Sequence, residues 1–221
     1  MDERLEKKLK TMLMLFLILI VVAAFSVNSR IKSKPIVFSE SLDMVVMQLD
    51  GSDVTLEELA FYVAYEEATV QESAVVYNPD NPKEYWNLHT NGTFVKLAAK
   101  QAVLDMAIHD FIFYEKAMEQ GIALTEEEMT YVENEYHDFC ADFETWQWSA
   151  LGIDETQIAE TMECIALANK CQGLLAQEEG VAYTEYNFDG TAYENLAQQY
   201  EVKVDEGLWE RVPFGKITLA N

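Results

Sequence analysis

The sequence contains one long uncharged apolar run, residues 11–27, and no second run of that kind. A helix needs about 20 apolar residues to cross the hydrocarbon core of a bilayer, and flanking Lys10 and Arg30 can extend their charged ends to the headgroups. The run therefore predicts a single transmembrane helix, with the rest of the chain on one side of the membrane.

A signal peptide is the second interpretation of the same run. Basic residues precede it, and residues 24–26 (Ala-Phe-Ser) form a small-x-small cleavage pattern. We expect the run to be retained as an anchor or uncleaved signal, after a short cytoplasmic tail at 1–10. A juxtamembrane linker at 28–43 and an extracytoplasmic domain at 44–221 follow. Basic residues flank the run on both sides, so the predicted orientation depends on the shortness of the tail.

The residues beyond the run are strongly acidic. After Lys34 the chain has eight Lys or Arg and 36 Asp or Glu, a net charge of −28. A field of this sign repels phosphate backbones and anionic headgroups, so we expect no nucleic-acid binding. The charge favours solubility, and it also suits a basic protein or peptide partner; composition alone does not choose between these two roles.

Local signals divide the domain into helices. Thr55 with Glu58, and Thr125 with Glu128, have the spacing of capping boxes, and Gly121 and Gly180 are suited to helix C-termini. These signals predict helices over 55–76, 93–121, 125–150, 154–179 and 191–199. Residues 102–114 are apolar nearly all round, so the second helix should be the central one of the core.

Two short β-prone segments lie near the ends of the domain. Residues 44–49 precede the turn dipeptide Asp50-Gly51, and residues 200–204 alternate between polar and apolar. Neither segment satisfies its backbone groups alone, so we expect them to pair, with Val202 and Val204 toward the core and Trp209 buried nearby. The predicted fold class is mainly α: one helical domain with a small two-stranded β element joining its ends.

Two motifs resemble a known family. Residues 49–58 (LDGSDVTLEE) look like the opening of the N-terminal chaperone domain of SurA, PrsA and related exported peptidyl-prolyl isomerases. Residues 120–128 (QGIALTEEE) are similar to the hinge after the long apolar helix of that domain. The end of the chain, residues 200–209, looks like the tail of such proteins from Gram-positive bacteria, and the motifs occur in the family's order.

The resemblance implies a helical chaperone or foldase module outside the cytoplasmic membrane. It acts on unfolded or newly exported polypeptides, and its N- and C-terminal segments join. Enzymes of the family carry a parvulin-type isomerase domain before the last helix and strand, where this chain has only the stretch 179–190. We therefore expect a chaperone-like domain without isomerase activity.

Ionisable residues give no catalytic or metal site. His109-Asp110 and His137-Asp138 are adjacent pairs, and neighbours on a helix point in different directions, so we expect no acid-base dyad. The acidic residues of 126–135 lack the spacing of a calcium loop. Cys164 and Cys171 are about 10 Å apart along one helix, too far for a disulfide; a bridge from Cys140 to one of them and three free thiols are both open. We expect no catalytic residues, metal or cofactor.

Aromatic residues are the best candidates for a binding surface, because they offer large adaptable apolar area. We expect most of them to complete the core and a minority to bind peptide. The predicted peptide-binding residues are Tyr85, Trp86, Trp146, Trp148, Tyr62 and Tyr65, the first four in or beside predicted loops. The predicted function is a membrane-anchored chaperone-like protein. The alternatives are a structural subunit that holds one specific partner, or a degenerate isomerase; the oligomeric state is open.

Overall fold

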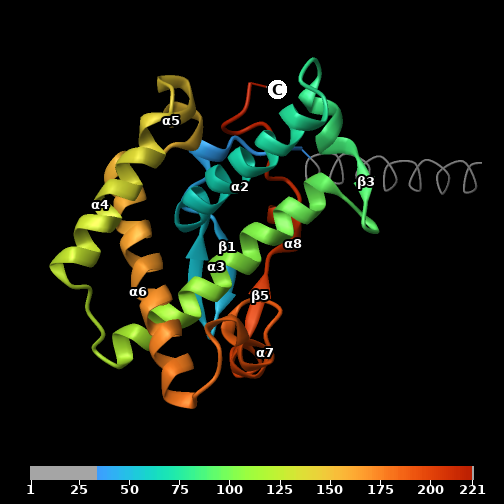
Figure 1. Ribbon diagram of the computed structural model, residues 1–221. Coiled ribbons are helices and arrows are strands. Elements are labelled where there is room, and N and C mark those ends of the chain that lie inside the picture. The colour runs from blue at the N-terminus through green and yellow to red at the C-terminus, as the bar shows by residue number, and fades with distance from the viewer. Residues whose placement is uncertain (1–33, 221) are drawn as a thin grey trace, which may run out of the picture.

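The computed structural model describes residues 34–220, so the predicted tail and apolar run lie outside the described residues. The longest elements of this body are four helices, α2 (Leu56–Tyr77), α3 (Val95–Glu119), α4 (Glu126–Ala141) and α6 (Glu155–Glu179). A small antiparallel sheet connects its two ends (Figure 1). The expectation of a mainly helical fold with a small β element is confirmed. No helix within 34–220 has the length and apolar character that a membrane span requires.

The sheet joins the start and the end of the domain, as predicted. Strand β1 (Val45–Leu49) pairs antiparallel with β5 (Val202–Val204), with Met47 opposite Val204. It also pairs with β2 (Ser52–Thr55), which the sequence analysis did not predict. Asp50 and Gly51 both have positive φ, 49° and 84°, as a tight two-residue hairpin turn requires. The β element is therefore three-stranded, in the order β2-β1-β5.

The predicted orientation of Val202 is wrong. Its side chain is 37% exposed and Val204 is half-buried, whereas Trp209 is buried as expected. The reason is that β5 is a three-residue edge strand with a neighbour on one side only, so little of the body covers it. Apolar residues of the central strand, Val46 and Met47, form the core side of the sheet instead.

Helix starts follow the predicted signals closely. The Thr55 hydroxyl accepts a hydrogen bond from the Glu58 amide, and the Glu58 carboxylate accepts one from the Thr55 amide at 2.8 Å, so the capping box is complete. The box of Thr125 and Glu128 starts α4 in the same way. Helix α6 ends at Gly180, whose φ of 68° places it in the left-handed region.

The helix predicted over 125–150 is two helices. Helix α4 ends at Ala141, and α5 (Thr145–Leu151) begins after Glu144. Glu144 has extended backbone and forms a further capping box with Gln147, whose side-chain oxygen accepts from the Glu144 amide at 2.8 Å. A local capping signal thus overrides the continuous helical pattern.

Short elements complete the body. The hairpin of β3 (His89–Thr90) and β4 (Thr93–Phe94) precedes α3, so the predicted helix start at residue 93 is two residues early; α3 begins at Val95, with Phe94 as its N-cap. The remaining elements are η1 (Phe38–Glu40), η2 (Pro82–Asn87), η3 (Tyr183–Tyr186), α7 (Thr191–Ala197) and α8 (Glu206–Trp209). The predicted linker is described from Lys34 onward. There, Ile36 and Phe38 are buried in the core, so this part of it belongs to the folded body.

The last residues of the described chain bind to a buried side chain of α2. Glu67 lies fully buried, and its carboxylate accepts hydrogen bonds from the backbone amides of residues 215–218 and from the Thr218 hydroxyl. Burial raises the pKa of Glu67, and these hydrogen bonds oppose that rise. The hydrogen bonds to Glu67 fix residues 215–218, which have no regular secondary structure, against the core.

Candidate functional site

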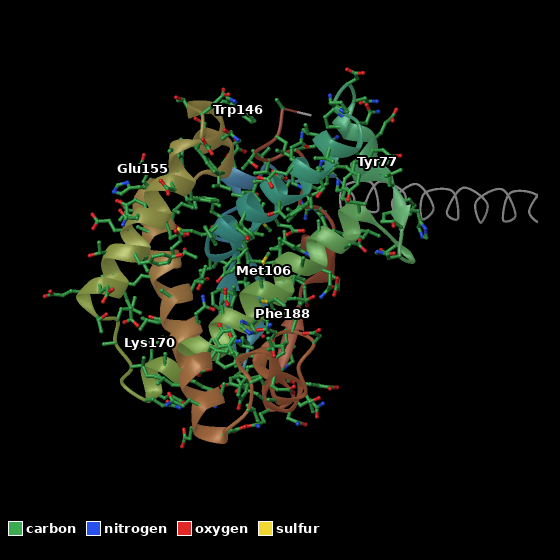
Figure 2. All side chains as sticks on the ribbon, viewed as in Figure 1. Tyr77, Met106, Trp146, Glu155, Lys170 and Phe188 are labelled. Carbon is green, nitrogen blue, oxygen red and sulfur yellow. The ribbon has the colours of Figure 1, made fainter. Side chains whose placement is uncertain are left out.

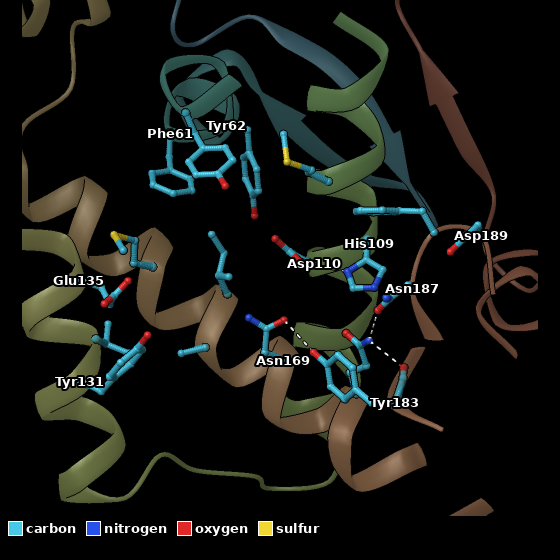
Figure 3. A pocket seen from close by; sticks show the side chains of 18 residues that line it. Phe61, Tyr62, His109, Asp110, Tyr131, Glu135, Asn169, Tyr183, Asn187 and Asp189 are labelled. Atoms are coloured by element: carbon cyan, nitrogen blue, oxygen red, sulfur yellow. Dashed lines mark hydrogen bonds and ion pairs between the residues drawn. The ribbon is translucent and has the colours of Figure 1, made fainter. Parts of the chain in front are cut away.

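The main cavity lies between α2, α3, α4, α6 and the segment around η3, and has a volume of about 660 Å³. Figure 3 shows side chains of these elements pointing toward one another across it. Most of the lining is aromatic or aliphatic: Phe61, Tyr62, Tyr65, Met106, Tyr131, Val132, Met162, Ile165, Tyr183 and Phe188. An opening of this size with a soft apolar lining suits side chains of an extended or helical segment.

Helical spacing brings the aromatic rings to one wall. Phe61 and Tyr65 are one turn apart on α2, and their rings stack with centroids 6.0 Å apart. Phe139 of α4 also packs against Phe61, with ring centroids 5.1 Å apart. Tyr131, at the opposite wall on α4, is 65% exposed. The cavity therefore has a packed aromatic side on α2 and a more exposed side on α4.

A polar network crosses the α3 wall. The Tyr62 hydroxyl donates to the Asp110 carboxylate, and burial raises the pKa of Tyr62 well above its ordinary value. His109 Nδ1 lies 3.0 Å from Asp110 Oδ1, and His109 Nε2 lies 3.0 Å from the Tyr186 carbonyl oxygen. A carbonyl oxygen only accepts, so His109 Nε2 is the donor in its hydrogen bond to Tyr186.

The expectation that the His109 and Asp110 side chains point in different directions is wrong, because His109 Nδ1 and Asp110 Oδ1 lie 3.0 Å apart. Adjacent residues diverge on an ideal helix, but here the Tyr186 carbonyl and the Tyr62 hydroxyl hold the two side chains together. The rings of Phe113, Phe188 and Tyr193 surround the imidazole, with centroids between 4.8 and 4.9 Å away. Both ring nitrogens are engaged, which makes His109 part of the wall rather than a free acid or base.

A second cavity, of about 590 Å³, meets the first at Tyr62. It lies between the β1-β2 hairpin and helices α2, α3 and α6, with Phe111, Met118 and Cys164 among its lining residues. Burial raises the pKa of the Cys164 thiol, so it remains protonated and is a poor nucleophile. The two cavities are neighbouring parts of one partly apolar, partly acidic surface.

The structure divides the six predicted peptide-binding residues. Tyr62 and Tyr65 line the main cavity. Trp86 does not, and its expected exposure is wrong: it is 5% exposed, its indole donates to Gln71 at 3.1 Å, and it packs on Phe214. Its place in η2, folded back against α2 and the C-terminal loop, could not be seen from the loop-like sequence.

The other three lie away from the main cavity. Tyr85 is half-buried against Tyr77, with ring centroids 5.5 Å apart. Trp146 is 40% exposed and lies at the α5 end of the molecule, far from Phe188 (Figure 2). Trp148 packs on Phe143 and lines a separate cavity of about 350 Å³.

Several lining residues escaped the sequence analysis. Phe61, Met106 and Phe188 belong to this group, as do the carboxylates of Asp110 and Glu135. The i, i+4 spacing of Phe61 with Tyr65 and of Tyr131 with Glu135 was a usable signal, since such pairs share a helix face. Phe188 had no such signal, because the loop after η3 brings it to the cavity.

The cysteines and acidic residues form no further site in the described body. Cys140, Cys164 and Cys171 are free thiols. Within residues 34–220, no cluster of three or more His, Cys, Asp or Glu side chains is arranged to hold a metal ion.

Comparison with known proteins returned no match. No protein-family model, curated protein or solved structure matches this chain.

Proposed function

We propose that this protein is a chaperone-like binder of exposed apolar segments in unfolded or newly exported polypeptides, and that it has no isomerase activity. The observation that carries the proposal is the main cavity, with its stacked aromatic wall on α2 and its flexible Met106 and Met162. Aromatic and methionine side chains adapt to many apolar shapes, as a binder of varied segments requires.

Three further features support the SurA/PrsA-like interpretation without an isomerase domain. Both resembling motifs start helices of the body through complete capping boxes, at Thr55 and at Thr125. The first and last strands of the described chain, β1 and β5, pair, as the resemblance implies. Between α6 and α7 the described chain has only η3 and its flanking turns, which leaves no room for a catalytic insert there.

We also propose that residues 11–27 anchor the protein, with the acidic body outside the cytoplasmic membrane. The basis is the uncharged length of the run. Intact-mass measurement of the protein purified from membranes should give the full-length mass. A mature N-terminus near Val27 would instead identify a cleaved signal peptide.

A holdase assay tests the function. The full chain, in nanodiscs of zwitterionic lipid, should slow the aggregation of a denatured model protein, followed by light scattering against empty nanodiscs. Tyr131→Ser should weaken this effect about fivefold, because an exposed aromatic contact contributes on the order of 1 kcal/mol. Tyr77→Ser is the matched control, a 55% exposed tyrosine outside the cavities, and should change nothing.

The same preparation should not accelerate prolyl isomerisation of a peptide. Catalysis well above the uncatalysed rate, which takes tens of seconds or more, would contradict the claim of no isomerase activity. No holdase effect at all, together with one stoichiometric partner in crosslinked cells, would favour a structural subunit instead.

A further inference from the structure

Charge of one sign lines both cavities. No Lys or Arg side chain of residues 34–220 lines either cavity, whereas several carboxylates do. These are Asp110, Glu135 and Asp189 in the main cavity, and Asp53, Glu57, Glu58, Glu115 and Glu160 in the second. Some of these have internal partners; Glu58, for example, completes a capping box. Within residues 34–220, however, Glu135 and Asp189 make no hydrogen bond or ion pair, so their carboxylates are available to an occupant.

Two lysines of the body, Lys100 and Lys170, are engaged away from the cavities. Lys170 lies 2.6 Å from Glu128 and donates to the Ala123 carbonyl. Lys100 donates to the carbonyls of Trp209 and Glu210, at 2.7 and 3.1 Å. Neither of these lysines lines a cavity, so they do not neutralise the carboxylates there.

Carboxylates and aromatic rings stand side by side in the main cavity. Tyr131 and Glu135 are one turn apart on α4, and Figure 3 shows both facing the space across from Asp110. The stacked rings of Phe61 and Tyr65 form the neighbouring wall. A ring face attracts an ammonium or guanidinium group, and a nearby carboxylate adds a charge-assisted hydrogen bond. Lys and Arg side chains suit this combination, and the methylene stems of these side chains pack on apolar walls.

We propose that the two cavities select polypeptide segments in which Lys or Arg stands beside large apolar residues. This inference rests on the proposed function and names its substrate class. An acidic segment is excluded by repulsion from the unpaired carboxylates, and a neutral apolar segment binds without their contribution.

Four peptides test the selection. Each has about 12 residues and is about 40 Å long when extended. In each peptide, one set of positions holds either Leu/Phe or Ser, and the other set holds either Lys or Gln, which gives the four combinations. Binding to the full chain in zwitterionic nanodiscs is measured by fluorescence anisotropy at about 0.15 M salt, where the Debye length is about 8 Å and remote charges are screened. The Leu/Phe-Lys peptide should bind at least about tenfold more tightly than the Leu/Phe-Gln peptide or the Ser-Lys peptide.

A matched pair of double variants locates the charge effect. Glu135→Gln with Asp189→Asn removes the two free carboxylates of the main cavity and should weaken the Leu/Phe-Lys peptide about three- to tenfold, leaving the Leu/Phe-Gln peptide unchanged. Glu133→Gln with Asp138→Asn makes the same chemical change at exposed positions of α4 outside both cavities, and should have no effect.

Each contrary result has a distinct meaning. Equal binding of the Leu/Phe-Lys and Leu/Phe-Gln peptides would overturn the charge selection and leave the proposed function standing. Suppose that the Ser-Lys peptide binds as tightly as the Leu/Phe-Lys peptide, or that the control double variant loses as much affinity as the cavity double variant. Either result would show that the net charge of the body attracts basic peptides in general, and would overturn the cavities as the source of the selection. Failure of all four peptides to bind would overturn the proposed function as well.

Discussion

At the residue scale, neighbouring glutamates on α2 show how surroundings decide the role of a side chain. Glu67 is buried and held by the amides of residues 215–218. Glu66 is half-buried and has no such donors, and burial raises its pKa from 4.5 to about 7. The Glu67 carboxylate therefore holds the end of the described chain in place, whereas the Glu66 carboxylate destabilises the folded state when it is charged.

Substituting each glutamate should shift stability in opposite directions at pH 8. The folded-state pKa of Glu66 is raised, so folding is favoured when this carboxyl is protonated. That contribution to the free energy of unfolding is complete below about pH 4.5 and is lost as pH rises through 7. After allowance for solvent screening, Glu66→Gln should stabilise the protein by about 1 kcal/mol at pH 8 and by nothing near pH 4.5. Glu67→Gln should destabilise it by about 2–4 kcal/mol, because the new amide group faces backbone donors.

Thermal unfolding of both variants at pH 4.5 and pH 8 checks this pair. A Glu66→Gln protein whose melting temperature differs equally from the parent at both pH values would contradict the raised pKa. A Glu67→Gln protein as stable as the parent would contradict the stabilising role of the hydrogen bonds between Glu67 and residues 215–218.

At the element scale, local signals predicted what local interactions determine. The starts of α2, α4 and α6 were predictable because capping groups lie within three residues of each other. Strand β2 and the β3-β4 hairpin were missed, although Asp50-Gly51 and Asn91-Gly92 adopt the positive φ angles of tight hairpin turns. The flanking strands are two to five residues long, too short for a periodic pattern to reveal them.

Removal of the last elements should unfold the body at a lower temperature. Truncation after Gln199 deletes β5, α8 and the residues that bind Glu67, and it uncovers Val46 and Met47. The expected loss is several kcal/mol, because each fully buried aliphatic side chain contributes about 1.5–3 kcal/mol. Deleting residues 220–221 alone is the control and should be neutral. Equal melting temperatures for the long and short truncations would show that the C-terminal segment adds nothing.

At the scale of the whole molecule, the candidate site was the least predictable feature. Its lining comes from α2, α3, α4, α6 and the loop after η3, which are distant in sequence. Tyr62 and Tyr65 were predicted as peptide-binding residues because aromatic side chains offer large adaptable apolar area, and both line the main cavity. The sequence could not show that Trp86 turns inward, because its burial depends on Phe214, far along the chain.

The pairing of β1 with β5 also constrains how the protein is made. Strand β1 and Glu67 are translated well before their partners at 202–204 and 215–218. The core around α2 therefore cannot close until residues 202–218 have left the ribosome. A protein proposed to bind unfolded chains is thus itself incompletely folded, and a potential client of such a binder, until residues 202–218 are available.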